Sequence, residues 1–212
     1  MDQHHDPYHH ERDQRLADRL AVPGGVRPTV WRTPPPQRLG CLTPQIARLL
    51  LDGYTSVGDL VIDVDDDIAF AATAAASGRR HHGLGGDIHL ATLGHAAGYI
   101  DLILMHWPRP AVNPQWLLRA CRSLLYAARH LAVAVTVDPD QRVAQLGALY
   151  GAAGAAGLRS VGHISAVAPT PDTPAPGGAT SAGGFPANGG PEPPVRPHTD
   201  LLILEPDGDH HD

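Results

Sequence analysis

At residues 54–63 the sequence reads YTSVGDLVID, a turn that runs into a short β-rich segment. Residues 60–62 are Leu-Val-Ile, and Gly58 and Asp63 bound them. Such a run predicts a buried strand. A second apolar run, Tyr99–Met105, has its apolar residues in succession rather than in alternation, which indicates burial on both faces and therefore a parallel sheet.

Helix-like and strand-like segments alternate around these two runs, which predicts an open α/β sheet with right-handed crossovers. The helices are expected over residues 43–53, 68–77, 116–129 and 141–156. Further strands are expected around Leu84 and over 131–137, 159–167 and 201–204. The last two strands have no helix between them, so we expect them to pair antiparallel at one edge of a mostly parallel sheet.

Composition predicts one domain with loosely packed ends. Residues 1–38 are polar and then rich in Pro and Gly, so we expect a flexible N-terminal segment, in which Arg12–Leu20 is a candidate for a short helix. The α/β domain is expected over 39–168 and 198–206. Between these parts lies a low-complexity insert at 169–197, in which 15 of 29 residues are Pro or Gly. Residues 207–212 form an acidic tail.

The charge balance disfavours several function classes. Sixteen Arg, with no Lys, stand against 22 acidic residues, for a net charge of −6. A protein that binds nucleic acid by itself usually carries a basic patch, so autonomous binding is not expected. No apolar run has the length of a membrane span, and Cys41 and Cys121 are too few for a disulfide framework. We therefore expect a cytoplasmic protein with no membrane contact.

Several motifs occur in the order seen in one enzyme family. Val30-Trp31-Arg32-Thr33 comes first, and the segment at 54–63 follows it. Then come Gly78-Arg79-Arg80 and Asp101-Leu102-Ile103-Leu104. Over about residues 30–168 and 198–206 the chain resembles the S-adenosylmethionine (SAM)-dependent DNA amino-methyltransferases, which modify adenine or cytosine. The resemblance implies a Rossmann-like SAM-methyltransferase fold.

The departures from the family fall on the residues that would hold the cofactor. In the family a glycine-rich loop follows the first strand, because bare backbone can approach the SAM methionine. Here Asp63 is followed by Val64, three further Asp residues at 65–67 and, at 70, a Phe. The Asp carboxylates would face the carboxylate of SAM. The family's ribose-binding acid is replaced by Gly85, with Asp87 as the nearest substitute.

The catalytic tetrapeptide of the family is also replaced. It consists of a small polar or acidic residue, two prolines and an aromatic that stacks on the flipped base. This chain has His106, Trp107, Pro108 and Arg109 at these positions. Only Pro108 stands in register, and Arg109 occupies the place of the stacking ring. No catalytic role follows from the resemblance for these four residues.

Other residues have structural interpretations. The Asp residues at 63–67 are expected to form a solvated acidic turn rather than a site for Mg²⁺ or Ca²⁺, and the terminal His clusters predict no functional metal site. His81 and His82 are expected at the surface. Cys41 and Cys121 are expected to be buried structural thiols.

The sequence leaves two functional hypotheses. In the first, the chain is a degenerate relative of the family that has lost SAM-dependent catalysis and acts as a binding or scaffold module, with an intact methyltransferase paralogue or another protein as its partner. In the alternative, it is an active SAM-dependent N-methyltransferase with a remodelled cofactor loop and an unknown substrate.

Overall fold

The computed structural model describes residues 7–36, 41–85, 93, 98–109, 111–169 and 197–208. Seven strands form one sheet in the order β1-β6-β7-β5-β4-β2-β3. The strands are β1 (Thr29–Arg32), β2 (Leu60–Asp63), β3 (Arg80–Gly83), β4 (Ile100–Trp107), β5 (Leu125–Val135), β6 (Leu158–Val167) and β7 (Pro197–Pro206). The helices are α1 (Pro7–Leu20), α2 (Pro44–Tyr54), α3 (Ile68–Ala76), α4 (Pro114–Leu124) and α5 (Pro139–Ala155).

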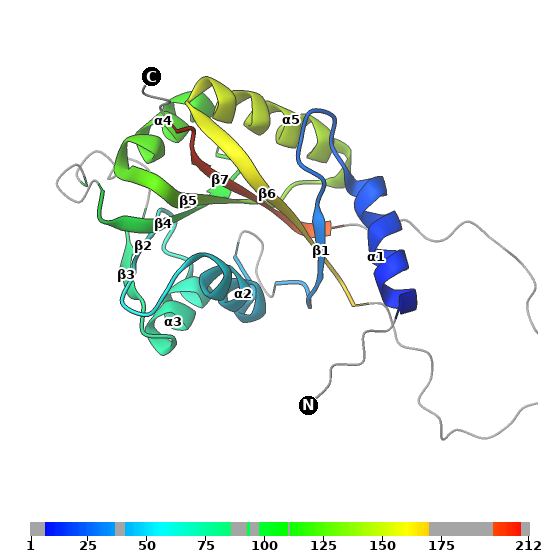
Figure 1. Ribbon diagram of the computed structural model, residues 1–212, viewed down its shortest axis with the longest axis horizontal. Helices are drawn as coiled ribbons and strands as arrows, with labels where there is room; N and C mark the ends of the chain where they lie inside the picture. The colour runs from blue at the N-terminus through cyan, green and yellow to red at the C-terminus, as the bar shows by residue number, and fades with distance from the viewer. Residues whose placement is uncertain are drawn as a thin grey trace, which may run out of the picture.

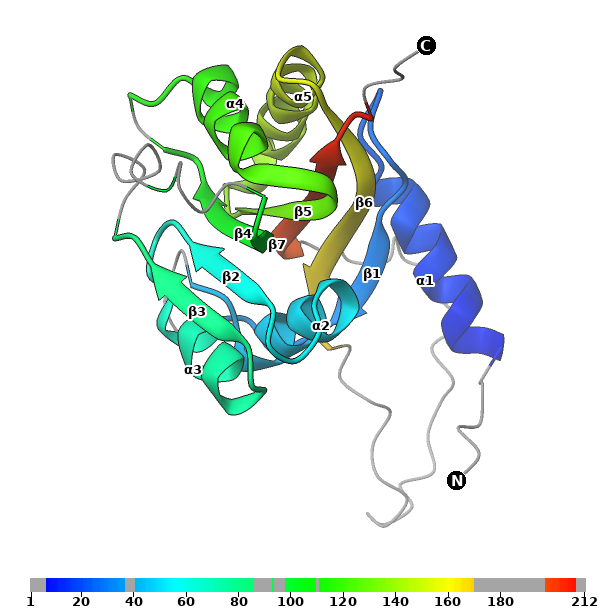
Figure 2. The ribbon, with the colours of Figure 1, turned by 60° about the vertical axis from the view of Figure 1, so that its left-hand side comes forward.

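The sheet is the middle layer of three. Helices α4 and α5 cover one face, and α2 and α3 cover the other (Figures 1 and 2). Side chains of β4 alternate between the two cores: Ile103 and Met105 pack with α4 and α5, and Leu102 and Leu104 pack with α2 and α3. Burial on both faces explains why the apolar residues of this strand are consecutive, as the sequence predicted.

Strand β7 lies inside the sheet rather than at its edge. It pairs antiparallel with β5 on one side and with β6 on the other. The antiparallel pairing of the last two strands is confirmed, whereas the predicted edge position is wrong. The physical reason is that residues 201–204 are buried on both faces of the sheet. An edge position would leave the backbone N–H and C=O groups of one side of this strand unpaired, whereas between β5 and β6 the strand pairs on both sides.

Ordered structure begins before residue 39. Helix α1 and strand β1 both lie within residues 1–38, which the sequence analysis assigned to a flexible segment, and β1 pairs parallel with β6. Leu16 and Leu20 of α1 pack with Val167, which explains why this polar helix stays at the sheet. Of the Pro/Gly-rich insert predicted at 169–197, all but the two end residues lie outside the described residues.

Helix α4 ends five residues earlier than its apolar spacing suggested. The predicted helix ran to Arg129, but the chain turns to strand at Leu125, and Ile100 of β4 pairs with Leu125. A register shift follows before Leu102 pairs with His130. Sheet pairing with β4 therefore overrides the local helical spacing over these residues.

The GRR motif has a structural role at the end of α2. Arg79 donates to the carbonyl oxygens of Leu51 (3.3 Å) and Thr55 (3.0 Å) and forms an ion pair with Asp52 at 3.2 Å. A cation at this end satisfies helix carbonyls that have no partner within the helix. Arg80 likewise donates to the carbonyl of Gly58 at 2.8 Å.

A buried ionic cluster joins β6, β7 and α5. Asp200 accepts from Arg142 at 2.7 and 2.8 Å and from Ser165 at 2.6 Å, and His163 Nε2 lies 2.8 Å from the same carboxylate. Arg142 also donates to the carbonyl of Leu20, the last residue of α1, at 2.9 Å. The cluster therefore connects the central strand β7 to both α5 and α1.

We predict that Asp200→Asn lowers the free energy of unfolding by about 3 kcal/mol, because it leaves a buried guanidinium without its counter-charge. Urea denaturation followed by circular dichroism measures this change. The matched control is Asp18→Asn, which removes the exposed partner of Arg27. A loss of less than about 1 kcal/mol is expected there, and equal losses for the two variants would contradict the prediction.

Candidate functional site

The strand order changes direction next to β2. This strand has β3 on one side and β4 on the other, so the crossover from β2 to β3 and the next one, from β3 to β4, run in opposite directions. In open α/β sheets, ligands bind at such a point, in the crevice outside the carboxyl ends of the strands. Here the two strand ends are Asp63 of β2 and Trp107 of β4. The candidate site is therefore formed by residues 63–67 and residues 106–109.

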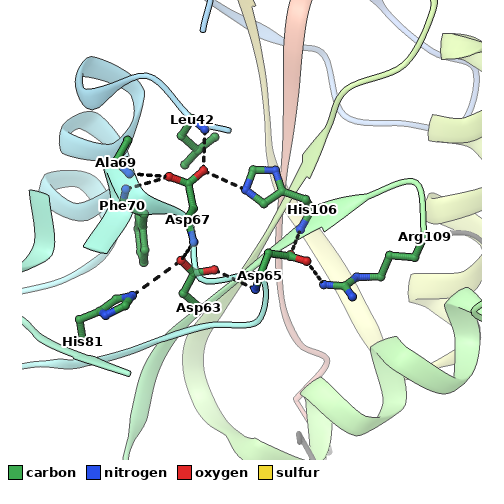
Figure 3. Close-up of polar contacts among 9 residues, drawn as sticks. All are labelled: Leu42, Asp63, Asp65, Asp67, Ala69, Phe70, His81, His106 and Arg109. Atoms are coloured by element: carbon green, nitrogen blue, oxygen red, sulfur yellow. Dashed lines mark hydrogen bonds and ion pairs between the residues drawn. The ribbon is translucent and has the colours of Figure 1, made fainter. Parts of the chain in front are cut away.

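The carboxylate of Asp63 closes the loop that follows β2. The Asp63 side chain is fully buried, and its two oxygens accept from the backbone N–H of Asp65 at 3.0 Å and of Asp67 at 2.5 Å (Figure 3). Val64 is buried too, and its N–H donates to the carbonyl of Leu104 at 2.9 Å. The loop thus folds back on its own first residue.

Asp67 links three separate segments. One oxygen caps α3 by accepting from the N–H groups of Ala69 (2.8 Å) and Phe70 (3.0 Å). The other accepts from the N–H of Leu42 at 2.6 Å and lies 3.2 Å from His106 Nε2 (Figure 3). Helix α3, the segment before α2 and the end of β4 therefore meet at one buried carboxylate.

Asp65 spans the crevice between the two loops. It accepts from the backbone N–H of His106 at 2.7 Å and forms an ion pair and hydrogen bond with the guanidinium of Arg109. Figure 3 shows this contact crossing from the loop after β2 to the loop after β4. The side chains of Asp65 and Arg109 are only 27% and 12% exposed, so the bridge lies within the crevice rather than on its rim.

The residues at the family's catalytic positions point in different directions. His106 lies on the α2–α3 side, beside Asp67. Trp107 lies in the opposite core, where its indole N–H donates to Gln145 of α5 at 2.8 Å. The Trp107–Pro108 peptide bond is cis, and Arg109 binds Asp65. The four residues therefore form no common surface on which a base could stack.

The pKa values of Asp63 and Asp67 shift in opposite directions. Burial raises the pKa of Asp63 above its ordinary value, although the N–H groups of Asp65 and Asp67 act against this. Burial also acts to raise the pKa of Asp67, but hydrogen bonds from His106, Leu42 and Phe70 outweigh it, and this pKa is lowered. Asp67 is therefore the more firmly ionised of the two.

The predicted solvated acidic turn is wrong, because Asp63 and Asp67 are buried and hydrogen-bonded. Asp66 alone among these carboxylates is exposed; its φ is +59°. Its carboxylate lies so close to Gly83 that a Cβ there would collide with it. A side chain at position 83 would therefore have to displace the exposed carboxylate of Asp66.

His81 is a site residue that the sequence analysis placed at the surface. Its side chain is only 16% exposed, its Nε2 lies 3.7 Å from Asp63, and its ring packs edge-on against Phe70. The two-residue alternation of β3, in which 81 and 83 share a face, is the signal that could have revealed it. Leu42, whose N–H reaches Asp67, carries no such signal. Asp87 lies outside the described residues.

A cavity of about 690 Å³ lies beside this loop, on the α2–α3 side of the sheet. Three segments line it: Pro34 and Pro35, residues 41–45, and the first turns of α3 through Ile68, Ala69 and Ala72. None of these described lining residues carries a charge. Sequence reasoning did not identify this cavity, because its three walls come together only in the folded chain.

The two cysteines differ in burial. Cys121 is fully buried, and burial raises its pKa to about 12. Cys41 is only half-buried, so the expectation of a buried thiol is wrong there.

Within the described residues, no group of three or more His, Cys, Asp or Glu side chains is placed to hold a metal ion. In the same part of the chain no helix is long and apolar enough to span a membrane.

We predict that Asp67→Asn lowers the free energy of unfolding at pH 7 by about 2 kcal/mol, since the carboxylate caps α3 and binds Leu42. Because the folded-state pKa of Asp67 lies below its ordinary value of 3.8, this contribution is complete above pH 3.8 and is lost as the pH falls further. Urea denaturation at pH 7 and below pH 3 measures this: the difference in free energy of unfolding between wild type and Asp67→Asn should be smaller at the lower pH.

The control for this experiment is Asp140→Asn, an exposed acidic residue in the first turn of α5. It should change the free energy of unfolding by no more than about 0.5 kcal/mol at pH 7. A difference between wild type and Asp67→Asn that grows as the pH falls would contradict the sign of the predicted linkage.

Comparison with known proteins gives a likeness of structure. No family model matches the sequence, and no curated protein matches it. The chain is similar in structure to a SAM-dependent methyltransferase from Agrobacterium tumefaciens, with a TM-score of 0.51 and 14% identity over 81% of this chain and 65% of that one. A geranyl diphosphate C-methyltransferase from Streptomyces coelicolor A3(2) matches with a TM-score of 0.42 and 12% identity, over 57% of this chain and 63% of that one.

The chain spans less than two thirds of the length of both structures. The likeness to the Agrobacterium enzyme agrees with the sheet, which is mostly parallel with an antiparallel strand between β5 and β6. The chain therefore has the α/β, Rossmann-like fold of the SAM-dependent methyltransferases, as the sequence predicted.

Proposed function

We propose that this chain is a degenerate relative of the DNA amino-methyltransferases that has lost SAM-dependent catalysis and acts as a binding or scaffold module. The bridge from Asp65 to Arg109 and to the His106 N–H is the observation that carries this proposal. It crosses the crevice at which open α/β sheets bind their ligands. A cofactor in that crevice would have to displace a partly buried ion pair.

The loop after β2 also fits SAM poorly in its hydrogen bonding. A bound amino-acid carboxylate needs free N–H donors. The N–H groups of Asp65 and Asp67 already bind Asp63, those of Ala69 and Phe70 bind Asp67, and that of His106 binds Asp65. Every one of these donors serves a carboxylate of the chain itself. The residues present in this loop therefore do not fit the cofactor.

The alternative function is an active SAM-dependent N-methyltransferase with a remodelled cofactor site and an unknown substrate. The cavity of about 690 Å³ beside α3 favours it, because ligand sites commonly measure about 300–1,000 Å³. This cavity is adjacent to the loop at 63–67 but is not the crevice between β2 and β4. The two functions differ in whether SAM binds to the chain.

We predict that SAM at 1 mM leaves the melting temperature of the chain unchanged within about 1 °C. A ligand present at 100 times its Kd would stabilise the fold by about 2.7 kcal/mol, which is readily detected. Differential scanning fluorimetry and isothermal titration calorimetry measure this, with a SAM-binding methyltransferase as the positive control. Saturable heat and a raised melting temperature would favour the alternative function.

The partner in this proposal is another protein, such as a catalytically intact methyltransferase paralogue, and not nucleic acid. The net charge of −6 supports this choice. We predict that duplex DNA at 150 mM salt gives no saturable change in fluorescence anisotropy with the chain alone. Tight retention of one sequence over a scrambled duplex of equal length would contradict this part of the proposal.

A further inference from the structure

We propose that the cavity between the N-terminal ends of α2 and α3 binds a neutral, apolar small molecule. The inference rests on the proposed function, because a chain that bound SAM here would need charged partners for it. The cavity is large enough for a ligand of two or three rings, at about 690 Å³. Its chemistry follows from what the lining residues can and cannot offer.

The donors at the start of α3 are already in use. The N–H groups of Ala69 and Phe70 bind the carboxylate of Asp67, and that of Ala71 binds its carbonyl. A helix N-terminus ordinarily favours anions through free N–H groups and its dipole. Here Asp67 supplies both the acceptors and the negative charge. An anion in the cavity would find these donors occupied and a like charge beside them.

Helix α2 offers no better site for an anion. Its first residue is Pro44, which has no N–H. The hydroxyl of Thr43 accepts from the N–H of Ile46 at 3.1 Å, and the carbonyl of Thr43 accepts from that of Ala47 at 2.9 Å. Thr43 thus occupies the N–H groups of Ile46 and Ala47 in the first turns of the helix. At both helix ends, a residue of the chain therefore already occupies N–H groups of the first turn.

A cationic ligand is equally disfavoured. Asp67, the buried acid next to the cavity wall, already accepts three backbone N–H groups and faces His106. No described lining residue is charged, so an ammonium or sulfonium group would be desolvated without a counter-charge. The described lining therefore offers no counter-charge to an ionised ligand of either sign.

The remaining surface favours an apolar ligand. Pro34, Pro35, Leu42 and Ala69 supply hydrocarbon walls. Ile68 also lines the cavity and is 68% exposed, so a ligand that covers it removes a large apolar side chain from water. Removal of this surface from water provides the driving force for binding.

The test uses two fluorescent probes with the same ring system. N-phenyl-1-naphthylamine is neutral, and 8-anilino-1-naphthalenesulfonate adds one negative charge. The full chain should bind the neutral probe saturably and at least tenfold more tightly than the anionic one. Ala72→Trp, which places an indole at the cavity wall, should weaken binding of the neutral probe at least tenfold.

The matched control is Ala75→Trp. Ala75 is exposed on the same helix but does not line the cavity, so its substitution should leave probe affinity unchanged within twofold. A cooperative thermal transition in both variants establishes that each is folded. Equal or tighter binding of the sulfonate, absence of saturable binding, or equal effects of the two substitutions would overturn the inference.

Addition of SAM separates this inference from the proposed function. A melting-temperature rise with SAM would contradict the proposed function, whatever the probes do. Failure of the neutral probe to bind at the Ala72 wall, with no response to SAM, would overturn the ligand class alone.

Discussion

The carboxylate of Asp67 is the interaction on which the arrangement of the site depends. It caps α3, binds the N–H of Leu42 before α2, and faces His106 at the end of β4. Opening the loop after β2 would leave this buried charge without partners, which is costly in a low-dielectric interior. The position of α3, the wall of the neighbouring cavity and the closure of the loop therefore change together or not at all.

The loop after β2 uses its backbone N–H groups differently from a glycine-rich loop at the same place in the fold. A glycine-rich loop leaves backbone donors free for a ligand, because no side chain competes for them. Here Asp63, Asp65 and Asp67 take these donors for the chain itself, and Arg109 neutralises the carboxylate that crosses the crevice. The sequence analysis expected the loop carboxylates to repel the carboxylate of SAM. In the structure, SAM binding is instead opposed by hydrogen bonds within the loop, which already use its N–H donors.

Strand β7 has a comparable role on the other side of the molecule. Its position between β5 and β6 buries Asp200, and the charge is balanced by Arg142 of α5. Arg142 in turn binds the end of α1, so the N-terminal helix is held by a residue more than 120 positions away in the chain. This explains why a polar N-terminal segment, rich in Pro and Gly, contributes a helix and an edge strand to the domain.

The sequence by itself determined most helices and strands after residue 39, because the spacing of apolar residues and the caps at Thr43 and Asn113 act locally. It did not determine α1, β1 or the end of α4. With the motif order, it also indicated the fold. Only the tertiary structure decided where β7 lies, which side His81 faces and what each aspartate binds. The reason is distance along the chain: Asp65 meets Arg109 44 residues later, and Asp67 meets Leu42 25 residues earlier. Such partners are set by strand order and packing, which no local pattern encodes.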